Sequence, residues 1–292
     1  MIVKSLIIFC FLFITYSVYI SSYKTISASQ NQNQDNLIKA QNFLFEQKKM
    51  SKNVIVGTSL SCHINTVSLS DFYNLSFNGS SIYDGLDIIA KSKKKPKRIY
   101  IEINYFLKNR SELFSSQLYT PFSYWLCENF KVFRWDSQPI GKLIHTFDVF
   151  GEKLVKHHRV FMEKVRYKLK KEKSKEVNNI TTNNLIKLQK EMYLVRPSTS
   201  ELKQSIILLN QSLLYLKKFN IKFIFFEMPV NSSFLQLPYS KVVRSIFHEG
   251  QFKNYKFIKV DTSYRYITSD GIHLKDNESK YFTTYLNNQI NK

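Results

Sequence analysis

The stretch Val54-Ile55-Val56-Gly57-Thr58-Ser59 most constrains what this chain can fold into. Three consecutive β-branched apolar residues are typical of a short buried strand. Gly57 then interrupts the strand, and a small residue and a serine follow it. The pattern predicts a serine at the carboxyl end of a strand, which is the edge where open α/β sheets bind ligands. Such a serine is either a turn or cap residue or, with a base in reach, a nucleophile.

Four further stretches predict strands that alternate with helices. The expected strands are 72–75, 98–104, 221–227 and 255–260, and the expected helices are 82–90, 202–216, 240–248 and one at the carboxyl end. Stretch 221–227 is almost wholly apolar, which suits a strand covered on both faces. Because parallel neighbours need right-handed crossovers, this order predicts an α/β fold with three layers (α/β/α) and a mainly parallel five-stranded sheet.

The amino terminus is a candidate membrane anchor. The 19 residues from Ser5 to Tyr23 carry no charge, and as a helix they just cross a bilayer core of about 30 Å. Tyrosines gather at the far end, as interface anchors do. A cleaved signal peptide is the alternative, although Ser27-Ala28-Ser29 is a poor cleavage site.

The predicted organisation has three parts. Residues 1–24 form a single-pass signal anchor, residues 25–50 a polar linker that is partly helical, and residues 51–292 one domain with a long helical insertion at about 105–220. Within the insertion, ten basic and four acidic residues lie between Gly151 and Glu176, on a helical pattern. This segment is either a basic helix for a membrane face or an anionic polymer, or an ordinary solvated helix.

The formal net charge of +21 narrows the class of partner. It indicates an acidic surrounding, such as an anionic membrane face or an acidic polymer, or else a base-composition bias of the genome. No nucleic-acid motif accompanies the charge, and an exported domain would not meet nucleic acid. The three cysteines form no zinc spacing or disulfide framework, although a bridge between Cys62 and Cys127 is possible. No metal or organic cofactor is indicated.

Three later positions could complete a site around Ser59. Gly79 lies in a turn after the second strand, where a backbone N–H could face the same sheet edge. Asn104 ends the third strand, and its amide could donate to an oxyanion or simply form a turn. Asp270 and His273 are three residues apart on a loop, so the carboxylate could orient the imidazole as a base for the serine. Each signal alone is also typical of an ordinary turn or surface residue.

Taken in order, these residues resemble the four blocks of the SGNH (GDSL-like) hydrolase family. The blocks correspond to Gly57-Thr58-Ser59-Leu60-Ser61, Asn78-Gly79-Ser80, Glu102-Ile103-Asn104 and Asp270-Gly271-Ile272-His273. Two departures stand out: Thr58 replaces a common aspartate, and Tyr105 follows Asn104 where the family often has aspartate. The resemblance does not cover residues 105–220.

The resemblance implies a role for each residue. Ser59 would be the nucleophile, His273 the general base and acid, and Asp270 its orienting carboxylate. The N–H groups of Ser59 and Gly79 and the side chain of Asn104 would form the oxyanion hole.

The anchored layout is similar to envelope SGNH proteins that work beside membrane-bound O-acyltransferases. It therefore implies an extracytoplasmic O-acyltransferase, with acetyl as the expected acyl group, that takes an acyl donor and modifies an anionic or neutral envelope or exported polysaccharide. An esterase that releases the acyl group to water shares every one of these residues. A non-catalytic glycan-binding or assembly protein on the same scaffold is the third alternative.

Overall fold

The computed structural model describes residues 2–22, 31–46, 51–69, 71–139 and 182–291. The chain divides into two compact units, of which unit 1 comprises Met1–Glu46 and Leu113–Glu172, and unit 2 comprises Gln47–Glu112 and Lys173–Lys292. Residues 140–181, which include the predicted basic helix, lie outside the described residues.

This division differs from the predicted one in two places. The expected insertion at 105–220 is shared between the units, because α7 (Thr199–Lys217) packs on α3 (Ile82–Lys91) in unit 2. The Tyr83 hydroxyl of α3 donates to Ser205 O of α7 at 3.0 Å. The expected linker at 25–50 is not a separate spacer, because its residues up to Glu46 belong to unit 1, and the partial helix expected there is confirmed as α2 (Gln32–Gln41), whose Leu37 and Ala40 are fully buried.

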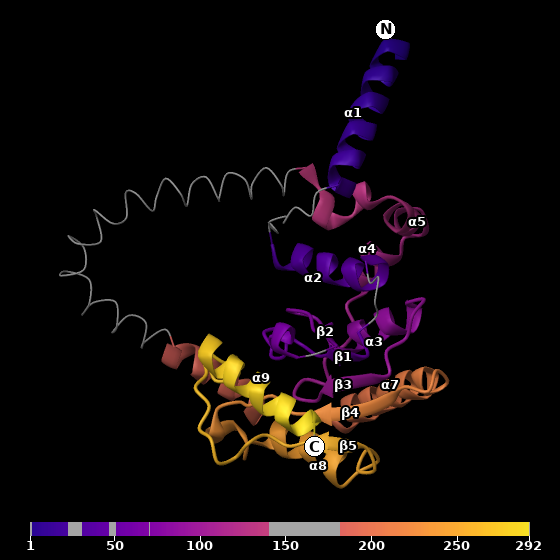
Figure 1. The fold of residues 1–292 in the computed structure, drawn as a ribbon. Helices are drawn as coiled ribbons and strands as arrows, with labels where there is room; N and C mark the ends of the chain where they lie inside the picture. The colour runs from indigo at the N-terminus through magenta and orange to yellow at the C-terminus, as the bar shows by residue number, and fades with distance from the viewer. Residues whose placement is uncertain (1, 23–30, 47–50, 70, 140–181, 292) are drawn as a thin grey trace, which may run out of the picture. The chain divides into compact units, whose positions relative to one another are not determined.

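Unit 2 is built on a five-stranded, all-parallel sheet in the order β2-β1-β3-β4-β5 (Figure 1). The strands are β1 (Asn53–Val56), β2 (Phe72–Asn74), β3 (Arg98–Glu102), β4 (Lys222–Phe226) and β5 (Lys256–Ile258). Each of the five predicted strands is therefore confirmed, although several end earlier than expected. The order changes direction between β1 and β3, and in open parallel sheets ligands bind at the carboxyl ends beside such a point.

Burial along the central strands explains their apolar composition. All four residues of β1 are buried, as are the last four of β3 and of β4. Because successive side chains of a strand point to opposite faces, both faces of these strands are covered. Phe226 belongs to a core cluster with Phe282 and Leu286 of α9 (Asp276–Ile290), whereas the Phe225 ring packs 4.9 Å from Phe247 of α8 (Pro238–His248).

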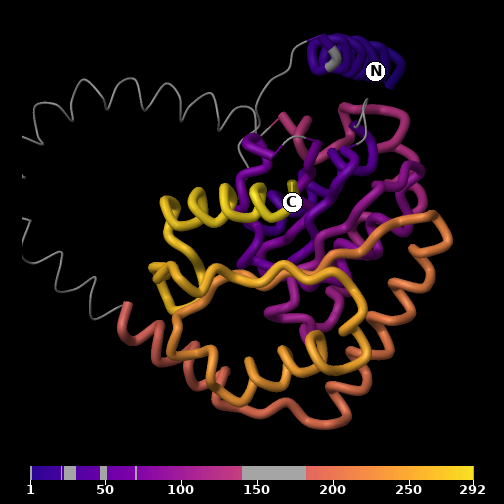
Figure 2. Tube along the Cα trace, turned by 60° about the horizontal axis from the view of Figure 1, so that its bottom comes forward, coloured from indigo at the N-terminus to yellow at the C-terminus, as the bar shows by residue number. Residues whose placement is uncertain are grey.

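The carboxyl-terminal helix α9 brings the two ends of unit 2 together. It lies beside the segment that follows β1 (Figure 2). Ser279 Oγ donates to His63 O at 2.9 Å, and the N–H of Asn65 donates to Thr283 Oγ1 at 3.4 Å. These bonds join residues more than 200 positions apart, so the loop just before α9 is carried to the end of β1.

Every regular element among the described residues of unit 1 is helical. It contains α1 (Ile2–Ser22), α2, the π-helical turn η1 (Asn42–Glu46), most of α4 (Glu112–Tyr119), α5 (Pro121–Asn129) and the 3-10 turns η3 (Lys131–Phe133) and η4 (Trp135–Ser137). Among the described residues, α1 alone is long and apolar enough to cross a membrane, over Ile2–Ile20. Cys10, Cys62 and Cys127 form no disulfide bond among the described residues, and Cys62 and Cys127 belong to different units.

Candidate active site

Ser59 lies in a tight turn directly after β1. The turn is closed by the N–H of Cys62, which donates to Thr58 O at 3.1 Å, and the Ser59 side chain is partly exposed. Gly57 is required for close packing, because a Cβ there would lie 1.9 Å from Ser61 Oγ and 2.6 Å from Glu102 Oε2. The glycine therefore lets the serine turn pack directly against a buried side chain of β3.

Asp270 and His273 are held on one tight loop. The N–H of Ser269 donates to His273 O at 2.8 Å, and Asp270 Oδ1 accepts from the N–H groups of Ile272 at 3.1 Å and His273 at 2.8 Å. Gly271 adopts φ +101°, and a Cβ there would approach the Phe234 ring to 2.7 Å. The spacing of three residues thus lets one carboxylate oxygen close the turn while the other faces the imidazole.

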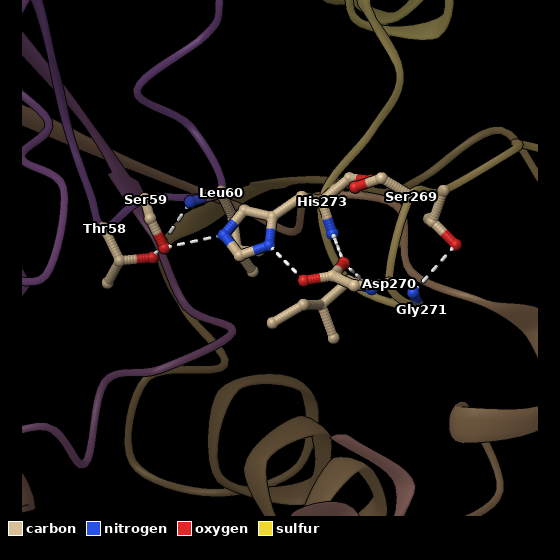
Figure 3. A network of polar contacts seen from close by, with 9 residues as sticks. Thr58, Ser59, Leu60, Ser269, Asp270, Gly271 and His273 are labelled. Carbon is tan, nitrogen blue, oxygen red and sulfur yellow. Dashed lines mark hydrogen bonds and ion pairs between the residues drawn. The ribbon is translucent and has the colours of Figure 1, made fainter. Parts of the chain in front are cut away.

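A chain of hydrogen bonds joins the two loops (Figure 3). His273 Nε2 lies 2.9 Å from Ser59 Oγ, and His273 Nδ1 lies 2.7 Å from Asp270 Oδ2. The three side chains predicted to act together are therefore brought within hydrogen-bonding distance, although Ser59 and His273 are 214 positions apart. Burial raises the pKa of the Asp270 carboxyl, but the hydrogen bonds from His273 and Ile272 outweigh it and hold that pKa below its ordinary value.

Glu102 lies directly behind the serine turn and is fully buried. It accepts from the N–H of Thr58 at 2.8 Å, from the Thr58 hydroxyl at 3.0 Å and from the Ser61 hydroxyl at 2.7 Å. Burial raises the pKa of the Glu102 carboxyl, and these donors only partly offset it. The carboxyl therefore holds Thr58 and Ser61 in place on either side of Ser59.

The two other predicted oxyanion donors lie at the same sheet edge. Leu75 donates to Ile55 O at 2.8 Å and Phe77 donates to Gly57 O at 3.3 Å, so the chain that leads into the Gly79 turn runs beside the Ser59 turn. Gly79 has φ +72°, and a Cβ there would meet nothing within 4 Å. Its positive φ suits the third position of a type II turn from Phe77 to Ser80.

Asn104 joins the ends of β3 and β4. Its Oδ1 accepts from the N–H of Met228 at 2.7 Å, and its Nδ2 donates to Met228 O at 2.9 Å. This pairing uses one of the two hydrogens of the Asn104 amide and leaves the other for an oxyanion, so the role of Asn104 as an oxyanion donor stays a prediction. Tyr105, where the family often has aspartate, packs its ring 6.0 Å from both Tyr193 and Tyr239.

Two supporting residues were not singled out by the sequence. Glu102 was read only as part of a motif block, because an acidic residue in an apolar strand gives no sign of its partners. Asn74 ends β2 and donates through Nδ2 to Ser61 O, Cys62 O and Ile64 O at 2.8–3.1 Å. A polar residue that ends a buried strand was the only signal for it.

This arrangement is able to move a proton from the Ser59 hydroxyl to His273 while Asp270 keeps the ring oriented. Within the described residues, no group of three or more histidine, cysteine, aspartate or glutamate side chains is placed to hold a metal ion. A scan against protein-family models finds no match for the chain, and a search of curated protein sequences finds none either.

Proposed function

We propose that this protein is a serine-dependent acyl-transfer enzyme whose nucleophile is Ser59. The observation that carries the proposal is the hydrogen-bonded chain from Ser59 through His273 to Asp270, at the carboxyl edge of a parallel sheet. Serine, histidine and carboxylate in this geometry are the parts required for acyl transfer on several unrelated folds. The partly exposed Ser59 leaves an ester room to approach.

The proposed reaction has two half-reactions. Ser59 Oγ attacks the carbonyl carbon of an ester while His273 Nε2 takes the hydroxyl proton, and the N–H groups of Ser59 and Gly79 with the Asn104 amide stabilise the oxyanion. The C–O bond to the leaving alcohol then breaks, and His273 returns the proton to that oxygen. In the second half, an acceptor hydroxyl gives its proton to His273 and attacks the acyl-serine, and Ser59 recovers its proton.

We further propose an SGNH-like domain that has helices on both faces of its sheet. The packing of α9 against Phe226 and of α8 against Phe225 supports this arrangement. The motif order supports the family, with Thr58 and Tyr105 as its departures.

The acceptor in this proposal is a hydroxyl of an envelope or exported polysaccharide, and the protein is anchored by α1 with unit 2 outside the cytoplasm. The net charge of +21 supports an anionic acceptor, and the length and composition of α1 support anchoring. The resemblance suggests a membrane-bound O-acyltransferase as a partner, and this partner would supply the acyl group.

An acyl-trapping experiment tests the proposal. The purified full-length protein is mixed with 4-nitrophenyl acetate, and the intact mass and peptide masses are recorded at early times. We expect one acetyl group on Ser59, which is lost to water or, faster, to an added acidic oligosaccharide. Ser59→Ala should remove this acetyl group, and Ser68→Ala is its matched control, because Ser68 is an exposed serine of the same unit whose hydroxyl donates to the nearby Asn65 O.

The outcomes separate the alternatives. Faster release in the presence of the oligosaccharide, with acetyl found on the sugar, supports a transferase, and release at one rate regardless of the sugar supports an esterase. Failure of Ser59 to become acetylated in a folded protein would leave only a binding or assembly role for the scaffold.

A further inference from the structure

A continuous ladder of aromatic rings runs from α1 to α5 in unit 1. Neighbouring ring centroids along it are 5.6–6.4 Å apart. In spatial order the aromatic ladder consists of Phe9, Phe13, Phe133, Phe130, Trp125 and Phe122. The ladder thus begins on the helix that is apolar enough to cross a membrane and ends on the short helix α5.

The rings of the aromatic ladder beyond α1 are exposed. The exposed fraction is 70% for Phe122, 51% for Trp125, 43% for Phe130 and 42% for Phe133. Folded domains normally bury rings of this size, and a contiguous exposed patch of them marks a surface that meets a partner or a membrane. Contact of this face of unit 1 with water is therefore unfavourable.

The junction between α1 and the aromatic ladder is fixed by other contacts. The Tyr16 hydroxyl donates to Ser137 O, and Ile20 is 2% exposed against the rest of the chain. Charged groups then hold η3 and the residue after it to η1, because Glu46 accepts from Lys131 at 3.0 Å and from Arg134 at 3.3 Å. The ladder is thus held at a defined height along α1.

The position of the ladder along α1 indicates what covers its exposed rings. Phe133 contacts α1 at Phe13, seven residues before Ile20, and at 1.5 Å per residue this lies about 10 Å inside the apolar span. The span Ile2–Ile20 is only just long enough for a bilayer core, so lipid that covers it reaches Phe133 as well. Amphipathic segments that lie in the membrane interface are immersed to a depth of about 5–10 Å, and aromatic rings are enriched there.

We propose that the aromatic ladder is embedded in the membrane interface, so that α5 and η3 rest in the lipid beside α1. The occupant of this face is the boundary between the lipid head groups and acyl chains. A second copy of the chain, or another protein, is the competing occupant. The proposal rests on anchoring by α1, which is part of the proposed function, and does not depend on the acyl-transfer chemistry of unit 2.

The two tryptophans of the chain allow a direct test. Trp135→Phe leaves Trp125 of the aromatic ladder as the sole tryptophan, and Trp125→Phe leaves Trp135 of η4 as the matched control. The full-length variants are reconstituted into phosphatidylcholine vesicles with or without acyl-chain-brominated phosphatidylcholine. Tryptophan emission is then measured with the brominated lipid and, separately, with acrylamide as a quencher dissolved in the water.

We expect the brominated lipid to quench Trp125 more strongly than Trp135 and acrylamide to quench Trp125 weakly. Quenching of Trp125 by acrylamide but not by the lipid would place the ladder in water and overturn the proposal. Protection of Trp125 from both quenchers would mean that protein covers it, which overturns the proposal equally. Should Trp135→Phe fail to fold, the quenching of Trp125 emission is obtained as the difference between wild type and Trp125→Phe.

Discussion

Glu102 offers a sharp test of how the serine turn is held. Replacing it by leucine keeps much of its volume but removes every acceptor. The buried N–H of Thr58 then has no partner, which costs about 1–3 kcal/mol, and each hydroxyl bond that is lost adds up to about 1 kcal/mol. Ser61 loses less, because Ser76 Oγ lies 2.9 Å from its hydroxyl. We therefore expect Glu102→Leu to lower the free energy of unfolding by about 2–4 kcal/mol.

Glutamine at the same position separates hydrogen bonding from charge. Its amide oxygen is able to accept from Thr58 N–H and Ser61 Oγ, and its NH₂ group can donate to Thr58 Oγ1, which also accepts. Burial raises the pKa of the Glu102 carboxyl, which means that the fold disfavours its charged form. We expect Glu102→Gln to change stability by less than about 1 kcal/mol.

The assay is the rate at which a fluorophosphonate labels Ser59, expressed per folded molecule, together with urea unfolding. Thr58 is the direct neighbour of Ser59, and each 1.4 kcal/mol lost from the placement of a reacting group slows reaction about tenfold. We expect Glu102→Leu to label at least about tenfold more slowly and Glu102→Gln nearly as fast as wild type.

Leu209→Ala is the matched control for lost stability. Leu209 is a fully buried residue of α7 that lies outside the core cluster containing Leu60, and its truncation should cost about 2–5 kcal/mol without slowing the labelling. Equal labelling rates for Glu102→Leu and wild type would refute the positioning argument, as would a Glu102→Gln variant as slow as the leucine variant.

Three other predictions concern the surrounding residues. Because folding lowers the pKa of Asp270, this carboxylate stabilises the fold at pH values above its ordinary pKa of about 3.9, and the stabilisation is lost as pH falls through the lower folded value. The difference in unfolding free energy between wild type and Asp270→Asn should therefore narrow below about pH 4. A difference that widens there would contradict this. Gly271→Ala should lower the free energy of unfolding by about 2–5 kcal/mol, because Gly271 has a positive φ and a Cβ there would clash with the Phe234 ring. Gly79→Ala, where a Cβ would meet open space, should cost only about 1 kcal/mol. Equal costs in urea unfolding would show that the clash at Gly271 is relieved. Asn104→Ala should slow phosphonate labelling by about 10²–10³, and wild-type labelling would leave Asn104 only its bond to the end of β4.

The strands and the loop motifs were predictable because their signals are local. Val54 to Val56 form the buried strand that their composition predicts, and the capping box between Ser198 and Glu201 at the start of α7 is of the same local kind, since its residues are three apart. The spacing of Asp270 and His273 likewise determines a turn in which the carboxylate meets both the backbone and the ring.

The parts that depend on distant pairing were not predictable. No local pattern shows that Glu102 accepts from Thr58, 44 positions earlier, or that Asn74 binds three carbonyl groups of the serine turn. The linker was expected to be partly helical, but no local pattern shows that Leu37 and Ala40 are fully buried and that α2 belongs to unit 1. Residues 113–139 group with the amino-terminal helix through contacts such as that between Phe133 and Phe13, which their composition does not reveal.

Peptide mapping of the phosphonate adduct tests the central claim most directly. The full-length protein is labelled, digested and analysed by mass spectrometry alongside His273→Ala and its matched control His63→Ala, an exposed histidine whose ring makes no bond in the described chain. The account predicts an adduct on Ser59, formed about 10²–10⁴ times more slowly in His273→Ala and at the wild-type rate in His63→Ala. An unreactive Ser59 in folded protein, or equal rates in both histidine variants, would contradict it.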